Sequence, residues 1–178
     1  MNYSYLDTPI GPLLIAGDDA AIRRIEFPTN GKARRPEPDW KESGRGPVGE
    51  AARQLREYFA GGRTEFDLPI APDGTPFQQS VWRHLQDIPY GATISYGELA
   101  RRTGNPKASR AVGAANGANP IPIVIPCHRV IGANGKLTGF GGGLPIKEKL
   151  LALEAKQLRL PIAGDKIAGA TVSGSSSR

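Results

Sequence analysis

Cysteine is almost absent from this chain of 178 residues, in which it occurs once, as Cys127. A single cysteine excludes a framework of intramolecular disulfides. Because a free thiol fits a reducing compartment, we expect the protein to be cytoplasmic. The only two histidines are His84 and His128, so a structural zinc site built from cysteine and histidine is not credible. We expect no metal and no cofactor.

Long apolar runs are also missing. No segment approaches the about 20 apolar residues that a transmembrane helix needs. Residues 1–7 lack the basic region and apolar core of a signal peptide. The sequence therefore predicts no association with a membrane.

Positive charge is in modest excess, because 23 lysines and arginines outnumber 17 acidic residues. A net charge of +6 suits a polyanionic partner, since each neutralised phosphate releases counterions. Many basic proteins bind no nucleic acid, so charge alone leaves this open. The length allows one domain, or two small ones, with a real core.

The N-terminal part reads as a small α+β unit with an antiparallel sheet. Its predicted elements are strands over 11–17, 20–27 and 64–70, a loop over 28–46 and a helix over 47–60. Turn residues at 17–19 predict that the first two strands form a hairpin. This part carries no recognisable chemistry.

A linker over 71–75 leads to a helical part with clear start signals. Thr75 and Gln78 predict a capping box that opens a helix ending near Asp87. A second capping box, at Ser95–Glu98, opens a short helix that ends near Arg102.

A further helix is predicted over 107–117, with Asn105 as its N-cap and Pro106 in its first turn. Two short helices joined by a turn that contains glycine describe a helix-turn-helix. The same pattern fits a helical hairpin packed in a core. Helix 107–117 is rich in small residues and carries one long cation, Arg110. This composition favours close approach to a groove over reading of base edges, and it also fits packing against another helix.

Cys127 follows an apolar stretch over 121–125 and stands between Pro126 and His128. A lone cysteine usually behaves as a small buried hydrophobe. As a nucleophile it has to become a thiolate and needs a base nearby. Adjacent side chains on a regular strand point to opposite faces, so a turn at Cys127 is required to bring His128 to the thiol.

The run Pro-Cys-His-Arg-Val at 126–130 resembles the signature of the O6-alkylguanine-DNA alkyltransferases, also called methylated-DNA–protein-cysteine methyltransferases. Four further segments resemble, in order, the family's recognition helix, its asparagine hinge, a loop and the helix that follows: 105–113, 119–126, 138–144 and 147–154. The resemblance covers about 75–155 strongly and 1–70 loosely.

The resemblance implies an α+β protein of two domains and a tail. These would be an N-terminal α+β domain over 1–70, a mostly helical domain over 75–160 and a flexible tail over 161–178. The second domain would contain a helix-turn-helix, bind DNA and hold the alkyl acceptor.

The resemblance also implies roles for individual residues. Cys127 would take the alkyl group and keep it as a thioether, so that the protein acts once. His128 would receive the thiol proton through a water, and Glu154 would orient and polarise that histidine. Asn119 would brace the turn that presents the cysteine, and Tyr96 would donate to the guanine ring.

The implied partner is double-stranded DNA that contains O6-alkylguanine, docked through its minor groove, with O4-alkylthymine as a further candidate substrate. The modified base would be flipped out of the duplex, and Arg110 would enter the stack in its place. The protein would act as a monomer, with cooperative binding along DNA left open.

Further DNA contacts would come from Tyr96, Asn105, Lys107 and Ser109. The base pocket would be formed by Pro122, Val130, Phe140 and Gly141.

The sequence departs from familiar members at three positions. Phe140 stands where a tyrosine is frequent, and Asn116 and Gly117 replace residues that are larger in some relatives. These departures would alter base packing and the size of the alkyl group accepted.

Two other functions fit parts of the pattern. A non-enzymatic damage sensor would share the DNA-binding domain, but such relatives lack the cysteine. A cysteine hydrolase using Cys127 and His128 would turn over without DNA and would need an oxyanion hole, which the sequence does not reveal.

Overall fold

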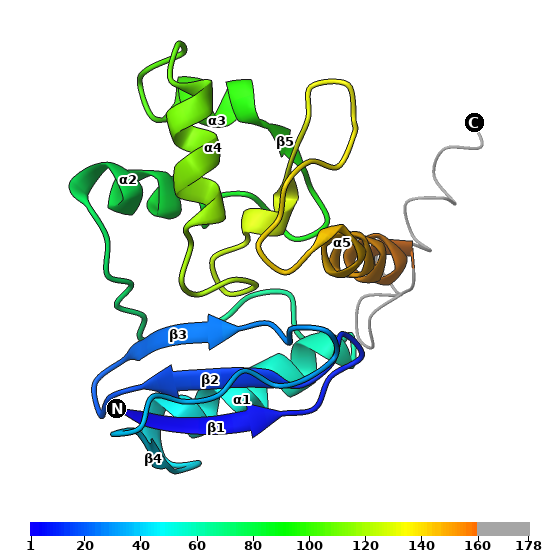
Figure 1. Cartoon of the computed structure of the whole chain (residues 1–178). Coiled ribbons are helices and arrows are strands. Elements are labelled where there is room, and N and C mark those ends of the chain that lie inside the picture. The colour runs from blue at the N-terminus through cyan, green and yellow to red at the C-terminus, as the bar shows by residue number, and fades with distance from the viewer. Residues whose placement is uncertain (160–178) are drawn as a thin grey trace, which may run out of the picture.

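The computed structural model describes residues 1–159, and the tail that we expected to be flexible lies outside the described residues. Figure 1 shows a sheet with one helix in the N-terminal part and a group of helices in the C-terminal part. The last helix lies where the two parts meet.

The N-terminal sheet has four strands in the order β3-β2-β1-β4. They are β1 (Asn2–Leu6), β2 (Leu13–Gly17), β3 (Ile22–Glu26) and β4 (Lys41–Glu42). β2 pairs antiparallel with β1 and β3, whereas β4 pairs parallel with β1. The predicted antiparallel sheet is therefore mixed at one edge. The predicted hairpin joins β2 to β3, and the Asp18 carboxylate accepts from the backbone N–H groups of Ala20 and Ala21, both at 2.9 Å.

The strand predicted over 64–70 does not form. Only one bridge, between Ile22 and Ile70, connects this segment to β3. The backbone N–H of Ile22 donates to the carbonyl of Pro69 at 2.8 Å, and Pro69 has no N–H with which to continue a ladder. β1 was not predicted, since its residues are mostly half-exposed and show no clear apolar alternation.

The predicted N-terminal helix is α1 (Gly46–Phe59). It packs across β1 and β2 (Figure 1). Val48, Ala51 and Leu55 are completely buried, as their helical spacing leads one to expect. Tyr58, in the last turn of α1, is also completely buried.

The C-terminal part consists of short helices and a small two-stranded sheet. Its elements are α2 (Pro76–Leu85), β5 (Ile94–Ser95), α3 (Tyr96–Arg102), α4 (Ser109–Gly117), a 3₁₀ turn (Cys127–Arg129), β6 (Val130–Ile131) and α5 (Leu144–Arg159).

Both hydrogen bonds of the predicted capping box between Thr75 and Gln78 are present, at 2.9 and 3.2 Å. The second capping box is half formed: Ser95 accepts from the N–H of Glu98 at 3.1 Å, but the Glu98 carboxylate pairs with arginines of its own helix.

The second helix of the helix-turn-helix begins later than predicted. α4 starts at Ser109 with Ala108 at its N-cap, so Asn105 is not the cap. The side-chain oxygen of Asn105 instead accepts from the N–H of Lys107 at 3.2 Å. This Asx turn offers the backbone an alternative to the helix, and Gly104, at φ +89°, supplies the left-handed position between α3 and α4.

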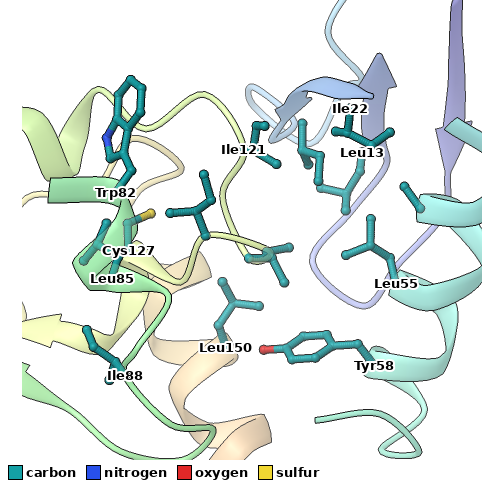
Figure 2. Close-up of a cluster of buried hydrophobic side chains, with 14 of the residues drawn as sticks. Leu13, Ile22, Leu55, Tyr58, Trp82, Leu85, Ile88, Ile121, Cys127 and Leu150 are labelled. Carbon is teal, nitrogen blue, oxygen red and sulfur yellow. The ribbon is translucent and has the colours of Figure 1, made fainter. Parts of the chain in front are cut away.

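A single hydrophobic core extends across the boundary between the two parts. Figure 2 shows Leu13 and Leu55 from the N-terminal part in the same cluster as Leu85 and Leu150 from the C-terminal part. Cys127 belongs to this cluster. Close packing on several sides therefore fixes the position of the thiol.

Candidate functional site

A compact turn presents Cys127. The Asn119 side chain donates to the carbonyl of Ile125 at 2.7 Å and accepts from the N–H of Ile121 at 2.9 Å. The 3₁₀ turn then begins at Cys127. The chain is thus not a regular strand here. The opposite orientation of adjacent side chains on a strand therefore does not keep His128 away from Cys127.

Backbone strain lies within this turn. Ile123 has φ +73°, a left-handed conformation that costs a non-glycine residue about 1–3 kcal/mol. The two hydrogen bonds of Asn119 span this residue. Asn119 therefore stabilises a conformation that the local sequence would otherwise disfavour.

His128 and Glu154 form a buried pair. The Nε2 atom of His128 lies 2.7 Å from Oε2 of Glu154, and the two side chains are 0% and 1% exposed. Burial lowers the pKa of His128 below its ordinary value, so the ring is neutral near pH 7. The neutral ring donates from Nε2 to the carboxylate, which leaves the lone pair on Nδ1. Within residues 1–159, this Nδ1 atom has no hydrogen-bond partner.

Glu154 accepts from three further residues that we did not predict as part of the site. Tyr58 donates its hydroxyl at 2.6 Å, Arg129 donates from Nε at 2.8 Å, and the backbone N–H of Gly91 donates at 3.1 Å. Burial by itself would raise the pKa of Glu154, but hydrogen bonds and charge from His128 and Arg129 outweigh it and hold that pKa well below its usual range. Since Arg129 carries a permanent charge, the carboxylate stays ionised beside a neutral histidine.

The thiol of Cys127 is protonated in this environment. Cys127 is only 5% exposed, and burial raises the pKa of its thiol to about 11. A hydrogen bond from Asn119 and the charge of Lys147 oppose this increase without cancelling it. Cys127 therefore needs a base to become a nucleophile at neutral pH.

Lys147 is completely buried, and its charge acts to lower the pKa of the Cys127 thiol. It donates to the carbonyls of Val130 and Thr138, at 2.6 and 3.2 Å. Its Nζ atom also lies over the rings of Tyr96 and Phe140, 5.9 and 5.8 Å from their centroids. Lys147 is the first residue of segment 147–154, which resembles a helix of the family, but no signal in the sequence indicated that this lysine would be buried.

A pocket of about 220 Å³ opens beside Cys127. Three residues that we predicted for the base pocket line it, namely Pro122, Phe140 and Gly141. Val130 is not among the residues that line this pocket; it is completely buried, and its carbonyl accepts from Lys147.

The N-terminal part also lines this pocket, although its sequence showed no recognisable chemistry. Its lining residues are Ile25, Glu26, Phe27, Pro28, Thr29 and Arg34. From the C-terminal part, Asn116 and Gly117 also line the pocket. The Asn116 side chain donates to the carbonyl of Cys127 at 3.3 Å. All three residues that depart from the resemblance, Asn116, Gly117 and Phe140, thus line the pocket.

The residues predicted to contact DNA are all less buried than His128 and Glu154. Asn105, Lys107 and Arg110 are exposed, and Ser109 is half-buried. Tyr96, the first residue of α3, is half-buried, and its hydroxyl accepts from the Thr138 hydroxyl at 3.3 Å. The structure therefore gathers the predicted acceptor, base and carboxylate in the interior and leaves the predicted DNA contacts on and before α4.

Neither a membrane span nor a metal cluster is found in the part of the chain that the structure describes. None of its helices is both long enough and apolar enough to cross a bilayer. Residues 1–159 also contain no group of three or more His, Cys, Asp and Glu side chains that could hold a metal ion.

Comparison with known proteins covers both parts of the chain. Residues 1–72 match the ribonuclease-like domain of 6-O-methylguanine DNA methyltransferase, and residues 76–156 match its DNA-binding domain. A methylated-DNA–protein-cysteine methyltransferase of Methanosarcina acetivorans is 56% identical over 155 residues, which are 86% of this chain and 98% of that protein. Another, from Mycolicibacterium paratuberculosis, is 51% identical over 88% of this chain and 93% of that protein.

A solved structure is similar over the same extent. The crystal structure of Mycobacterium tuberculosis OGT in complex with DNA has a TM-score of 0.81 and 48% identity, and the match covers 88% of this chain and 94% of that one. The resemblance inferred from the motifs and the predicted α+β fold class are confirmed. This chain belongs to the 6-O-methylguanine DNA methyltransferase family.

Proposed function

We propose that this protein repairs O6-alkylguanine in double-stranded DNA by moving the alkyl group onto its own Cys127. One observation carries the proposal. A single thiol opens onto a pocket, and the next residue is a neutral histidine held by a buried, ionised carboxylate. Membership of the family, whose curated relatives are named methylated-DNA–protein-cysteine methyltransferases, supports the same reaction.

The reaction balances with groups that the site supplies. The Cys127 thiol gives its proton to Nδ1 of His128 through a water. Its sulfur then attacks the alkyl carbon, the bond from that carbon to O6 breaks, and its electron pair stays on guanine. Tyr96 donates to the guanine ring as negative charge develops there. The product thioether has no path back to a thiol, so each molecule reacts once.

Electrostatics explains why the thiol needs this arrangement. Burial raises the pKa of Cys127 to about 11 and lowers the pKa of His128, so proton transfer between them is unfavourable at rest. The ionised Glu154 stabilises the imidazolium that forms, which is the orienting role of the third group in a nucleophile–base–carboxylate set. The thiolate is then generated only as the substrate is attacked.

The outer surface of α4 supports docking in the minor groove of DNA. Its exposed residues are small apart from Arg110, so its backbone can approach the minor groove closely. The alkylated base has to leave the duplex to reach Cys127, and Arg110 would occupy the space that it vacates. Lys107, Asn105 and Ser109 would contact the sugar–phosphate backbone, with little dependence on sequence. The protein would act as a monomer, and O4-alkylthymine is a second candidate substrate.

Intact-mass measurement after mixing with duplex DNA that contains O6-methylguanine tests the proposal. We expect each protein molecule to gain one methyl group, and Cys127→Ala to gain none. A protein that binds the duplex without any gain in mass would be a damage sensor. Release of product in excess of the protein would indicate a hydrolase instead. Either result would contradict the proposed reaction.

A further inference from the structure

Phe27 brings the N-terminal part into the wall of the pocket. It follows β3 directly and lines the pocket that contains Cys127. Its ring lies against the ring of Phe140, with centroids 5.4 Å apart and an interplanar angle of 48°. Aromatic pairs at this separation attract each other beyond their burial of apolar area. The two phenylalanines therefore form one continuous wall from segments 113 positions apart in the sequence.

A backbone hydrogen bond sets the position of this wall relative to the thiol. The N–H of Ile25, two residues before Phe27, donates to the carbonyl of Pro120 at 3.0 Å. Pro120 adjoins Asn119, which braces the turn that leads to Cys127. β3 and the cysteine turn are thus held together, so the place of the Phe27 ring is defined with respect to the acceptor.

Gly142 is in close contact with Phe27. A Cβ atom added at Gly142 would lie 2.6, 2.9 and 3.1 Å from three carbons of the Phe27 ring. The φ angle of Gly142 is not in the left-handed region, unlike that of Gly143 at +90°. Alanine would therefore fit the backbone at 142, and it is the Phe27 ring that requires glycine there. The neighbouring Gly141 has no such constraint, since a Cβ there would meet only the carbonyl of Gly117, at 3.9 Å.

We propose that Phe27 is a specificity-determining residue that sets, together with Phe140 and Gly142, the size of the alkyl group that reaches Cys127. The inference rests on the proposed function and adds to it that the N-terminal domain is a working part of the site. A packed aromatic wall does not yield freely to a larger group. Removing the Phe27 ring opens space beside the acceptor and also removes the support of Phe140.

The test compares two alkyl groups in one duplex. Rate constants for alkyl transfer are measured with oligonucleotides of identical sequence that carry O6-methylguanine or O6-benzylguanine. In Phe27→Ala we expect the ratio of the benzyl to the methyl rate constant to rise about tenfold, the scale on which pocket contacts separate substrates that differ in apolar size. Phe27→Leu should shift the ratio less. The ratio is informative because a merely structural loss of activity would lower both rates together.

Phe66→Ala is the matched control. Phe66 is a half-buried phenylalanine in the same N-terminal part, but it packs against Tyr58 and does not line this pocket. Its truncation should lower the stability of the domain and leave the ratio of the two rate constants unchanged. A shift in the ratio as large as that of Phe27→Ala would overturn the assignment to Phe27.

A double-mutant cycle tests the contact itself. Gly142→Ala should slow transfer from both substrates in the wild-type background, because its methyl group displaces the Phe27 ring. The same substitution should have little effect in Phe27→Ala, where the obstructing ring is gone. Equal effects in both backgrounds, or an unchanged ratio in Phe27→Ala, would overturn this inference while the wild type still takes up alkyl groups. A wild-type protein that takes up none would instead overturn the proposed function.

Discussion

His128 and Glu154 are joined by a hydrogen bond of 2.7 Å in the interior of the protein, where neither side chain is more than 1% exposed. They are 26 positions apart in the sequence and come from the 3₁₀ turn and from α5. Burial disfavours charge on the histidine, whereas Arg129 favours charge on the carboxylate. The pair is therefore poised to accept a proton from a neighbouring acid.

Glu154→Gln should strongly reduce alkyl transfer. The amide keeps the shape of the side chain but cannot stabilise an imidazolium by charge, so we expect the rate to fall about 10²- to 10⁴-fold, the range of general acid–base catalysis. The substitution also leaves Arg129 without its buried partner, which should lower the free energy of unfolding by about 3–5 kcal/mol.

Single-turnover kinetics and urea unfolding measure these two effects separately. Glu148→Gln, an exposed position on the same helix, is the matched control and should change neither quantity. A Glu154→Gln variant that reacts at the wild-type rate while folded would contradict the role assigned to the carboxylate.

The network around Glu154 also shows what the sequence can and cannot indicate. Local signals succeeded: the capping box at Thr75 involves residues three apart, and the Cys127 motif is contiguous. Tyr58 and Gly91 reach Glu154 across 96 and 63 positions, and no local pattern marks such contacts. In α1, Tyr58 simply reads as a core residue. Phe27 was missed for the same reason, because its partner Phe140 lies in the other domain.

The secondary-structure errors have a related cause. A strand needs a partner along its length, and segment 64–70 meets β3 through only one bridge. The helix starting at Ser109 was placed too early because Asn105 is equally suited to an N-cap and to an Asx turn. Which of the two forms depends on how the connection from α3 packs.

The stability of the protein should increase with pH on the acid side of neutrality. His128 has a lowered pKa in the folded state, so the unfolded chain binds more protons between that pKa and the ordinary value of about 6.5. Unfolding is therefore favoured as pH falls through this window, by up to about 1.4 kcal/mol per pH unit for one proton. The lowered pKa of Glu154 extends the loss below about pH 4.5.

Urea unfolding at intervals between pH 7 and pH 5 measures this slope. His128→Gln should flatten it, whereas His84→Gln should retain it, since His84 is half-exposed on α2. The prediction fails where His128→Gln and the wild type show the same slope.

Lys147→Met should loosen the segment that carries Phe140. The substitution preserves the length of the side chain but removes the donors to Val130 and Thr138. The buried carbonyl of Val130, left without a partner, costs about 1–3 kcal/mol. We expect lower stability, slower alkyl transfer and faster amide hydrogen exchange over residues 131–143. Lys149→Met, exposed on the same helix, should leave all three unchanged. Similar behaviour of the two variants would show that the hydrogen bonds of Lys147 are unimportant.

Arg110→Ala should separate base flipping from alkyl chemistry. Arg110 is exposed on α4 and lies outside the set of residues that line the pocket, so its removal should not alter how a free base reaches Cys127. Flipping a base out of a duplex costs a few kcal/mol, and a side chain that fills the gap lowers this cost. We therefore expect slower repair of O6-methylguanine in duplex DNA and an unchanged rate with free O6-benzylguanine.

Lys107→Ala, which removes a charge before the same helix, should instead weaken duplex binding in a salt-dependent way, because phosphate contacts release counterions. Equal slowing of both substrates by Arg110→Ala would mean that the arginine acts on the structure of the site and has no part in flipping.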